Sequence, residues 1–231
     1  MPARREPEWD ALLAAAARLQ RIVPDAVLVG GTAAALHAGH RVSYDDDHVV
    51  RDLKARFDTV LADLEETDSW ITARVARPVQ VLGSLDGVET GIRNLIRRRP
   101  LEVEVIDTPH GPVRIPTIAE MTRIKGWLVL RRNATRDYLD VVALAELLDT
   151  AAAGVLVGLD DWYADQIGPG GERVATQLAR QLAEPLPYDL SEVDLRSYRK
   201  LDGRWRDWRA VADACGGLAV SMLDHLVEER P

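Results

Sequence analysis

Apolar and polar positions follow two different periods along this chain. Short runs of apolar or β-favouring residues, or alternation of apolar and polar residues, predict strands at 27–29, 45–50, 70–75, 79–83, 101–107 and 113–115. Apolar residues spaced three and four apart predict helices at 8–23, 32–38 and 53–66, and then at 118–128, 135–147, 172–183 and 205–229. Strands therefore concentrate in the first half and helices in the second. This order predicts an α+β fold with a core at 1–116 and a mostly helical C-terminal region at 117–231.

The stretch from 27 to 50 joins two of the predicted strands through a glycine turn. A buried strand, Val27–Val29, runs directly into Gly30 and Gly31, and good helix formers begin at Thr32. Glycines at a helix N-terminus allow close backbone approach and leave N–H groups free to bind phosphate. The turn is therefore a candidate phosphate-binding site.

Three consecutive aspartates open the next predicted strand. Because side chains alternate between the faces of a strand, Asp45 and Asp47 share one face and Asp46 points the other way. Two neighbouring carboxylates repel each other unless a cation lies between them, and Mg²⁺ favours such oxygen ligands. A phosphate-binding turn beside this Asp-x-Asp pair predicts a site that transfers a nucleotidyl group.

These residues also carry a family resemblance. Gly30-Gly31-Thr32, followed by His40-Arg41-x-Ser43-x-Asp45-x-Asp47, resembles the signature of the DNA-polymerase-β-type nucleotidyltransferases, and most closely their AbiEii/AbiGii toxin family. Downstream, Pro116–Met121, Lys125 and Arg136-Asp137-x-x-Asp140 continue that pattern, so the resemblance covers roughly residues 20 to 150. It implies a nucleotidyltransferase core with a mixed sheet flanked by helices. The chain departs from the family pattern at Asp46 and His48.

The resemblance implies roles for individual residues. Asp45 and Asp47, with a third carboxylate, would hold two Mg²⁺ ions; Glu104 is the first candidate for that carboxylate and Glu102 the second, or both are exposed glutamates of an edge strand. Gly30, Gly31 and Thr32 would bind the β- and γ-phosphates of an NTP, with Arg41 and Ser43 as further contacts. Lys125 would neutralise the departing pyrophosphate, unless it is a surface lysine, and Asp137 would orient Lys125 or the acceptor. For Asp140, simple helix capping is the expectation.

The expected activity is the Mg²⁺-dependent transfer of an NMP to an acceptor hydroxyl. By resemblance, the acceptor is RNA, namely the 3′ end of tRNA, and the protein is a toxin with a cognate antitoxin. Two alternatives stay open: an antibiotic-type nucleotidyltransferase with a small-molecule acceptor, or a non-catalytic nucleotide-binding protein of the same fold. The net charge of −8 argues against a protein that coats nucleic acid and mildly favours a cationic small acceptor.

Composition and the termini predict a cytoplasmic protein. The single cysteine, Cys215, excludes an internal disulfide and is expected to be buried. Residues 1–6 lack the apolar core of a signal peptide, and no apolar run approaches the ~20 residues of a membrane span, so no membrane partner is expected.

Overall fold

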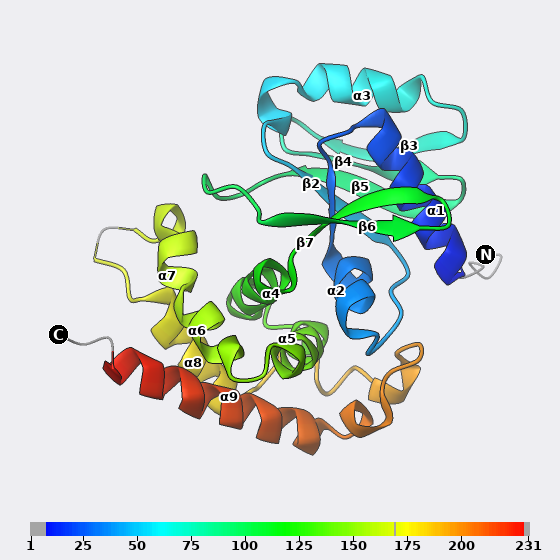
Figure 1. The fold of residues 1–231 in the computed structure, drawn as a ribbon. Helices are drawn as coiled ribbons and strands as arrows, with labels where there is room; N and C mark the ends of the chain where they lie inside the picture. The colour runs from blue at the N-terminus through cyan, green and yellow to red at the C-terminus, as the bar shows by residue number, and fades with distance from the viewer. Residues whose placement is uncertain (1–7, 169, 229–231) are drawn as a thin grey trace. The chain divides into compact units, whose positions relative to one another are not determined.

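The computed structural model describes residues 8–168 and 170–228, which form two compact units (Figure 1). The first unit contains residues up to 36, 42–96 and 100–117, and the second contains 37–41, 97–99 and everything from 118 onward. The main division thus falls at Thr117, next to the boundary that the sequence predicts. The short segments 37–41 and 97–99 belong to the second unit, where Arg97 pairs with Glu120 at 2.5 Å. The expectation about residues 1–6 lies outside the described range.

The first unit is built on a mixed five-stranded sheet, as the predicted α+β class requires. Its strands are β1 (Val27–Val29), β2 (Asp46–Val50), β3 (Trp70–Ala76), β4 (Gln80–Leu85) and β5 (Val88–Asn94). They lie in the order β1-β2-β5-β4-β3. Only β2 and β5 are parallel, whereas the other neighbours are antiparallel. Strands β2 and β5 therefore run in the same direction, and the aspartates lie at the N-terminal end of β2.

One face of this sheet is buried beneath two helices. Helices α1 (Trp9–Ile22) and α3 (Phe57–Glu65), with the 3₁₀ turn η1 (Leu53–Ala55), pack on it. Their apolar side chains form one cluster with those of the strands: Leu19, Val23, Val50, Leu53, Phe57, Val60, Leu64, Val81, Leu85 and Ile92. The sequence predicted one helix over 53–66, and the structure divides it at Arg56. The opposite face, which carries Asp47, Val49 and Arg93, is the more open one.

Strand β5 is absent from the sequence prediction, although it lies at the centre of the sheet. It forms a hairpin with β4 around Asp86 and Gly87, whose φ angles are 52° and 81°. Two consecutive residues with positive φ define the turn that Asp-Gly favours in hairpins. That dipeptide was therefore the signal that could have identified the strand. A second hairpin, β6 (Val103–Thr108) with β7 (Gly111–Pro116), forms a separate two-stranded sheet, as predicted for these two segments.

The second unit is helical. It contains α4 (Ile118–Arg132), α5 (Thr135–Leu148), α6 (Ala151–Val157), α7 (Leu159–Trp162), α8 (Val174–Ala183) and α9 (Trp208–Glu228), whereas α2 (Gly30–Ala38) begins in the first unit and ends in the second. The sequence did not predict α6 and α7. Helix α9 continues without a break through Gly216 and Gly217. Cys215 belongs to the buried core, as expected, and Trp205 lies in the same core.

Helix α9 also bears on the expected absence of a membrane span. The stretch from residue 208 to 227 is long and apolar enough to cross a membrane by length and composition, and 33% of it is buried. Buried Val211, Cys215, Ala219, Met222 and Leu226 recur every three or four residues along it. A helix with such a stripe packs against a core, here that of the second unit.

Candidate functional site

Gly30 lies against the carboxylate of Asp47 at the start of α2. Strand β1 pairs with β2 so that Val29 is opposite Asp47, and the chain turns into α2 immediately afterwards. Gly30 has a φ of +74°, and a Cβ built on it would lie 3.2 Å from both Cβ and Oδ2 of Asp47. Only glycine combines that backbone angle with so close an approach. The sequence thus places a helix N-terminus beside one of the predicted metal ligands.

Asp45 and Asp47 lie on the open side of the sheet, as strand alternation predicts. Asp45 is exposed, and the side chain of Asp47 is 32% exposed. The hydroxyl of Ser43 donates to Oδ1 of Asp45 at 3.0 Å, and the hydroxyl of Thr32 donates to its main-chain carbonyl at 2.7 Å. Two predicted nucleotide-binding residues therefore fix the position of the first aspartate in this structure.

Asp46 and His48 point to the opposite, buried face. Neither side chain forms a hydrogen bond of good geometry with a described residue, although Thr32 lies close enough to Asp46, and the main chain of Asp46 close enough to His48, to act on their pKa values. Burial raises the pKa of Asp46 well above its ordinary 3.8, and burial lowers the pKa of His48 to about 3. Both shifts favour the uncharged form, which avoids placing an unpaired charge in the core.

A third carboxylate faces the same side as Asp45 and Asp47, and it is Glu89 on β5. Thr90 pairs with the buried Asp46, so Glu89, one residue earlier, points to the open side. Glu89 and Arg93 line a hollow of about 270 Å³ together with the aspartates, and Nε of Arg93 lies 3.5 Å from Oδ1 of Asp47.

The predicted position of Glu104 is therefore corrected. The sequence placed it on a strand beside the Asp-x-Asp strand, but β6 pairs only with β7 in a separate sheet within the part of the chain that the structure describes. Glu102, the second candidate, precedes the same hairpin. The prediction failed because the true neighbour, β5, was not identified in the sequence.

The second unit holds the predicted Lys125 and Arg41 in a buried ion cluster around Asp140. Nζ of Lys125 lies 2.7 Å from Oδ2 of Asp140, and Arg41 donates two hydrogen bonds of 2.7 and 2.9 Å to the two carboxylate oxygens. His40 adds a contact of 2.7 Å. Lys125 is only 1% exposed, so it is not the surface lysine of the alternative interpretation.

This cluster changes the expectation for Asp140. Burial alone would raise the pKa of its carboxyl, but the charges of Arg41 and Lys125 and the hydrogen bond from His40 outweigh burial and hold the pKa well below 3.8. Asp140 is therefore the anionic centre that three basic side chains share, rather than a simple helix cap.

Asp137 is also buried and paired. Arg132 donates to its two oxygens at 2.7 and 3.1 Å, a bidentate arrangement that fixes the carboxylate plane. In this structure Asp137 thus contacts Arg132, and Lys125 contacts Asp140. The roles that the resemblance gives to Lys125 and Asp137 remain predictions.

The residues of the open sheet face fit a magnesium ion. Among the described residues no three His, Cys, Asp or Glu side chains form a ready metal-binding group. Magnesium, however, is usually bound by one or two carboxylates together with water and substrate phosphates. Asp45 and Asp47 provide two carboxylates on an accessible face, next to a glycine turn suited to phosphate.

Comparison with known proteins gives partial similarities. No family model matches the chain. It is 38% identical over 130 residues to the "Mycolic acid-containing lipids exporter MmpL11" of Mycolicibacterium smegmatis, and 39% identical over 133 residues to the "Heme uptake protein MmpL11" of Mycobacterium tuberculosis. Each alignment covers 55% of this chain, and the chain spans only 13% of the length of these relatives.

Among solved structures, the chain is similar to an antigenic nucleotidyltransferase-like protein from Paracoccidioides brasiliensis. Its TM-score is 0.47 at 15% identity, covering 68% of this chain and 89% of that chain.

Proposed function

We propose that this protein is a Mg²⁺-dependent nucleotidyltransferase that moves an NMP from an NTP to an acceptor hydroxyl. The observation that supports it best is the position of Gly30 against Asp47, with Asp45 on the same open face. A phosphate-binding turn and a carboxylate pair are thereby adjacent. That combination suits a triphosphate and its metal better than it suits an uncharged ligand.

In the proposed reaction the acceptor oxygen attacks the α-phosphorus of the NTP. A bond forms between them, the bond from the α-phosphorus to the bridging oxygen breaks, and pyrophosphate leaves with the electron pair. The acceptor proton passes to a carboxylate of the site. Positioning and charge stabilisation supply most of the catalysis in phosphoryl transfer.

Each residue of the first unit has a part in this proposal. Asp45 and Asp47 would hold Mg²⁺, which supplies charge neutralisation for the phosphates when bound. Glu89 replaces Glu104 as the third carboxylate. The amides of Gly30 and Gly31 would bind the β- and γ-phosphates, and Ser43 and Thr32 keep Asp45 in place through the hydrogen bonds described above.

The proposed acceptor is RNA, with the 3′ end of tRNA as the first candidate. The family resemblance supports this acceptor and also a toxin role in the cytoplasm with an antitoxin partner. Modifying tRNA in this way would stop translation. Induced expression should therefore arrest growth, and Asp45→Asn should remove the arrest.

Transfer can be tested directly with α-³²P-labelled NTPs, Mg²⁺ and total tRNA. We expect label on RNA with at least one of the four NTPs, and none with Asp45→Asn or after chelation of the metal by EDTA. RNA is excluded as the acceptor if no NTP labels RNA while the purified wild-type protein still binds NTP and Mg²⁺.

A small-molecule acceptor is the second candidate, and the net charge of −8 supports it through attraction of cationic antibiotics. The matching assay replaces tRNA with aminoglycosides. Resistance without growth arrest on expression would favour this activity over RNA modification.

A further inference from the structure

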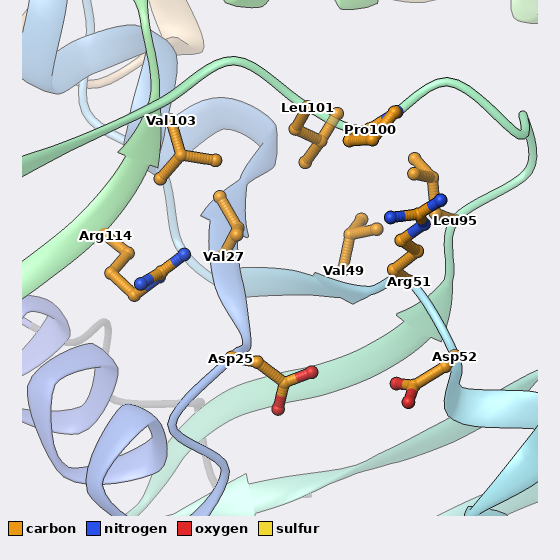
Figure 2. A pocket seen from close by; sticks show the side chains of 10 residues that line it. All are labelled: Asp25, Val27, Val49, Arg51, Asp52, Leu95, Pro100, Leu101, Val103 and Arg114. Carbon is orange, nitrogen blue, oxygen red and sulfur yellow. The ribbon is translucent and has the colours of Figure 1, made fainter.

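A second hollow in the first unit lies on the same sheet face as the proposed catalytic carboxylates. It has a volume of about 540 Å³. Its lining is Asp25, Val27, Val49, Arg51, Asp52, Leu95, Pro100, Leu101, Val103 and Arg114, and we refer to it as the Val27–Val49 pocket (Figure 2). No residue of the proposed metal or phosphate site belongs to this lining.

Strand register sets the position of this pocket relative to the carboxylates. Val27 pairs with Val49 and Val29 with Asp47, so all four side chains point to one face. Val49 is two residues after Asp47, which corresponds to about 7 Å along the strand. A ligand bound on Val49 could therefore place a neighbouring chemical group beside the carboxylates of Asp45 and Asp47.

The floor of the pocket is apolar and the rim is basic. Val27 is 5% exposed, and Figure 2 shows Arg51 and Arg114 on opposite sides of the two valines. Within the described part of the chain, neither guanidinium has an ion-pair or side-chain hydrogen-bond partner. Two exposed guanidinium groups beside an apolar floor suit a flat, apolar group that carries negative charge.

The carboxylates of the rim do not cancel these cations. Arg56 pairs with Asp25 and also with Asp52, the latter at 2.9 Å, so a third arginine already offsets one of the two negative charges. The net charge of these five side chains remains positive. Arg51 and Arg114 are consequently available to an anion from outside.

The side of the pocket that carries Arg114 is held in place by hydrogen bonds between the main chain of Arg114 and the side chain of Gln20. Nε2 of Gln20 donates to the carbonyl of Arg114 at 3.0 Å, and the amide of Arg114 donates to Oε1 of Gln20 at 2.7 Å. This two-way contact attaches β7 to α1, within the same unit. The pocket wall therefore has a fixed backbone, and only its basic side chain extends outward.

We infer that the Val27–Val49 pocket binds a nucleotide of the RNA acceptor. A base would lie on the valine floor, and Arg51 and Arg114 would contact the adjoining phosphodiester. An NTP is a poorer occupant, because its phosphates are all drawn to the glycine turn and the metal. A cationic antibiotic is poorer still, because the two guanidinium groups repel it. This inference rests on the proposed function, which makes RNA the acceptor of the transferred nucleotidyl group.

The test measures binding separately from transfer. The probe is a short single-stranded RNA labelled with fluorescein, and its Kd is measured by anisotropy over a range of salt concentrations without NTP or Mg²⁺. The variant Arg51→Gln/Arg114→Gln removes both phosphate contacts. The control Lys54→Gln/Arg196→Gln removes two exposed cations that do not line the pocket.

Counterion release gives the expected size of the effect. For single strands the slope of log K against log salt is about −0.7 per phosphate contact, so losing two contacts should reduce the slope by about 1.4. At 0.1 M salt this corresponds to a Kd about 25-fold higher for the pocket variant. The control should keep the wild-type Kd and slope.

Three outcomes are informative. If the pocket variant matches the control, or if the wild-type protein binds no RNA, the inference is overturned. Transfer of label to an acceptor by the wild-type protein would in that case still support the proposed function. If instead the slope changes as expected but no NTP labels RNA, the pocket is supported as an RNA site and the proposed transfer to RNA fails.

Discussion

Gly30→Ala tests whether the glycine turn and Asp47 depend on each other. Gly30 has a φ of +74°, which lies in the left-handed region of backbone conformation. Placing a residue with a side chain there destabilises the folded protein by about 1–2 kcal/mol. The new methyl would also lie 3.2 Å from Cβ and Oδ2 of Asp47, closer than the 3.5–4.0 Å at which carbon atoms pack well. Overpacking of this kind adds about 1–3 kcal/mol or displaces the carboxylate.

Gly87→Ala is the matched control. Gly87 has a φ of +81°, but nothing lies within 4 Å of a Cβ built there, so this variant carries the backbone cost without the contact. Urea unfolding should show Gly30→Ala to be less stable than Gly87→Ala by about 1–3 kcal/mol. Transfer should fall at least about tenfold in Gly30→Ala alone, since a small misplacement of reacting groups slows catalysis strongly. Equal stability and equal activity of the two variants would refute the argument.

Further predictions concern the other charged and buried groups. Asp140→Asn should cost about 3–5 kcal/mol, because it leaves buried cations unpaired, whereas exposed Asp161→Asn should stay within about 0.5 kcal/mol in the same unfolding assay. Since the folded pKa of Asp140 is lowered, its stabilisation is present at neutral pH and should disappear as pH falls below 3.8, a loss that Asp140→Asn should not show. Burial raises the pKa of Cys215 to about 12, so its thiol should react with Ellman's reagent at pH 8 only after denaturation, and rapid native labelling would contradict the burial. Glu89→Gln should reduce Mg²⁺-dependent transfer at least about tenfold while Glu104→Gln leaves it unchanged, and the reverse result would restore Glu104.

Periodicity in the sequence predicted most elements of the fold. Strands β1 and β2, the β6–β7 hairpin and helices α1, α5 and α8 lie close to their predicted ranges, because each has a clear apolar face. The helical second half follows from the same signal. Boundaries were less well predicted, as the division of 53–66 into η1 and α3 shows.

The central strand β5 could not be identified from periodicity alone. Its buried positions Val88, Thr90 and Ile92 alternate correctly, but a threonine replaces one apolar residue and Gly91 interrupts the run. The Asp86-Gly87 turn was the better signal. Missing this strand led directly to the choice of Glu104, because the third carboxylate was sought on the next obvious strand.

The ion cluster around Asp140 shows a different limit. Asp140 is 15 residues from Lys125 and 100 residues from His40 in the sequence, yet all three side chains meet in the second unit. Charge and spacing within one helix predict only local partners such as caps. Tertiary pairing of this kind depends on how helices pack, which no local pattern records.

The position of Asp46 and His48 bears on whether the site is intact. These residues are the two departures from the family pattern, and they suggested a decayed, non-catalytic protein. Both lie on the buried face of the sheet, where Asp46 is 1% and His48 0% exposed, whereas Asp45 and Asp47 face the open side. A change on the buried face alters what the core contains and leaves the oxygen donors of the open face in place. The two departures from the family pattern therefore do not argue against catalysis, and they are compatible with the proposed active enzyme.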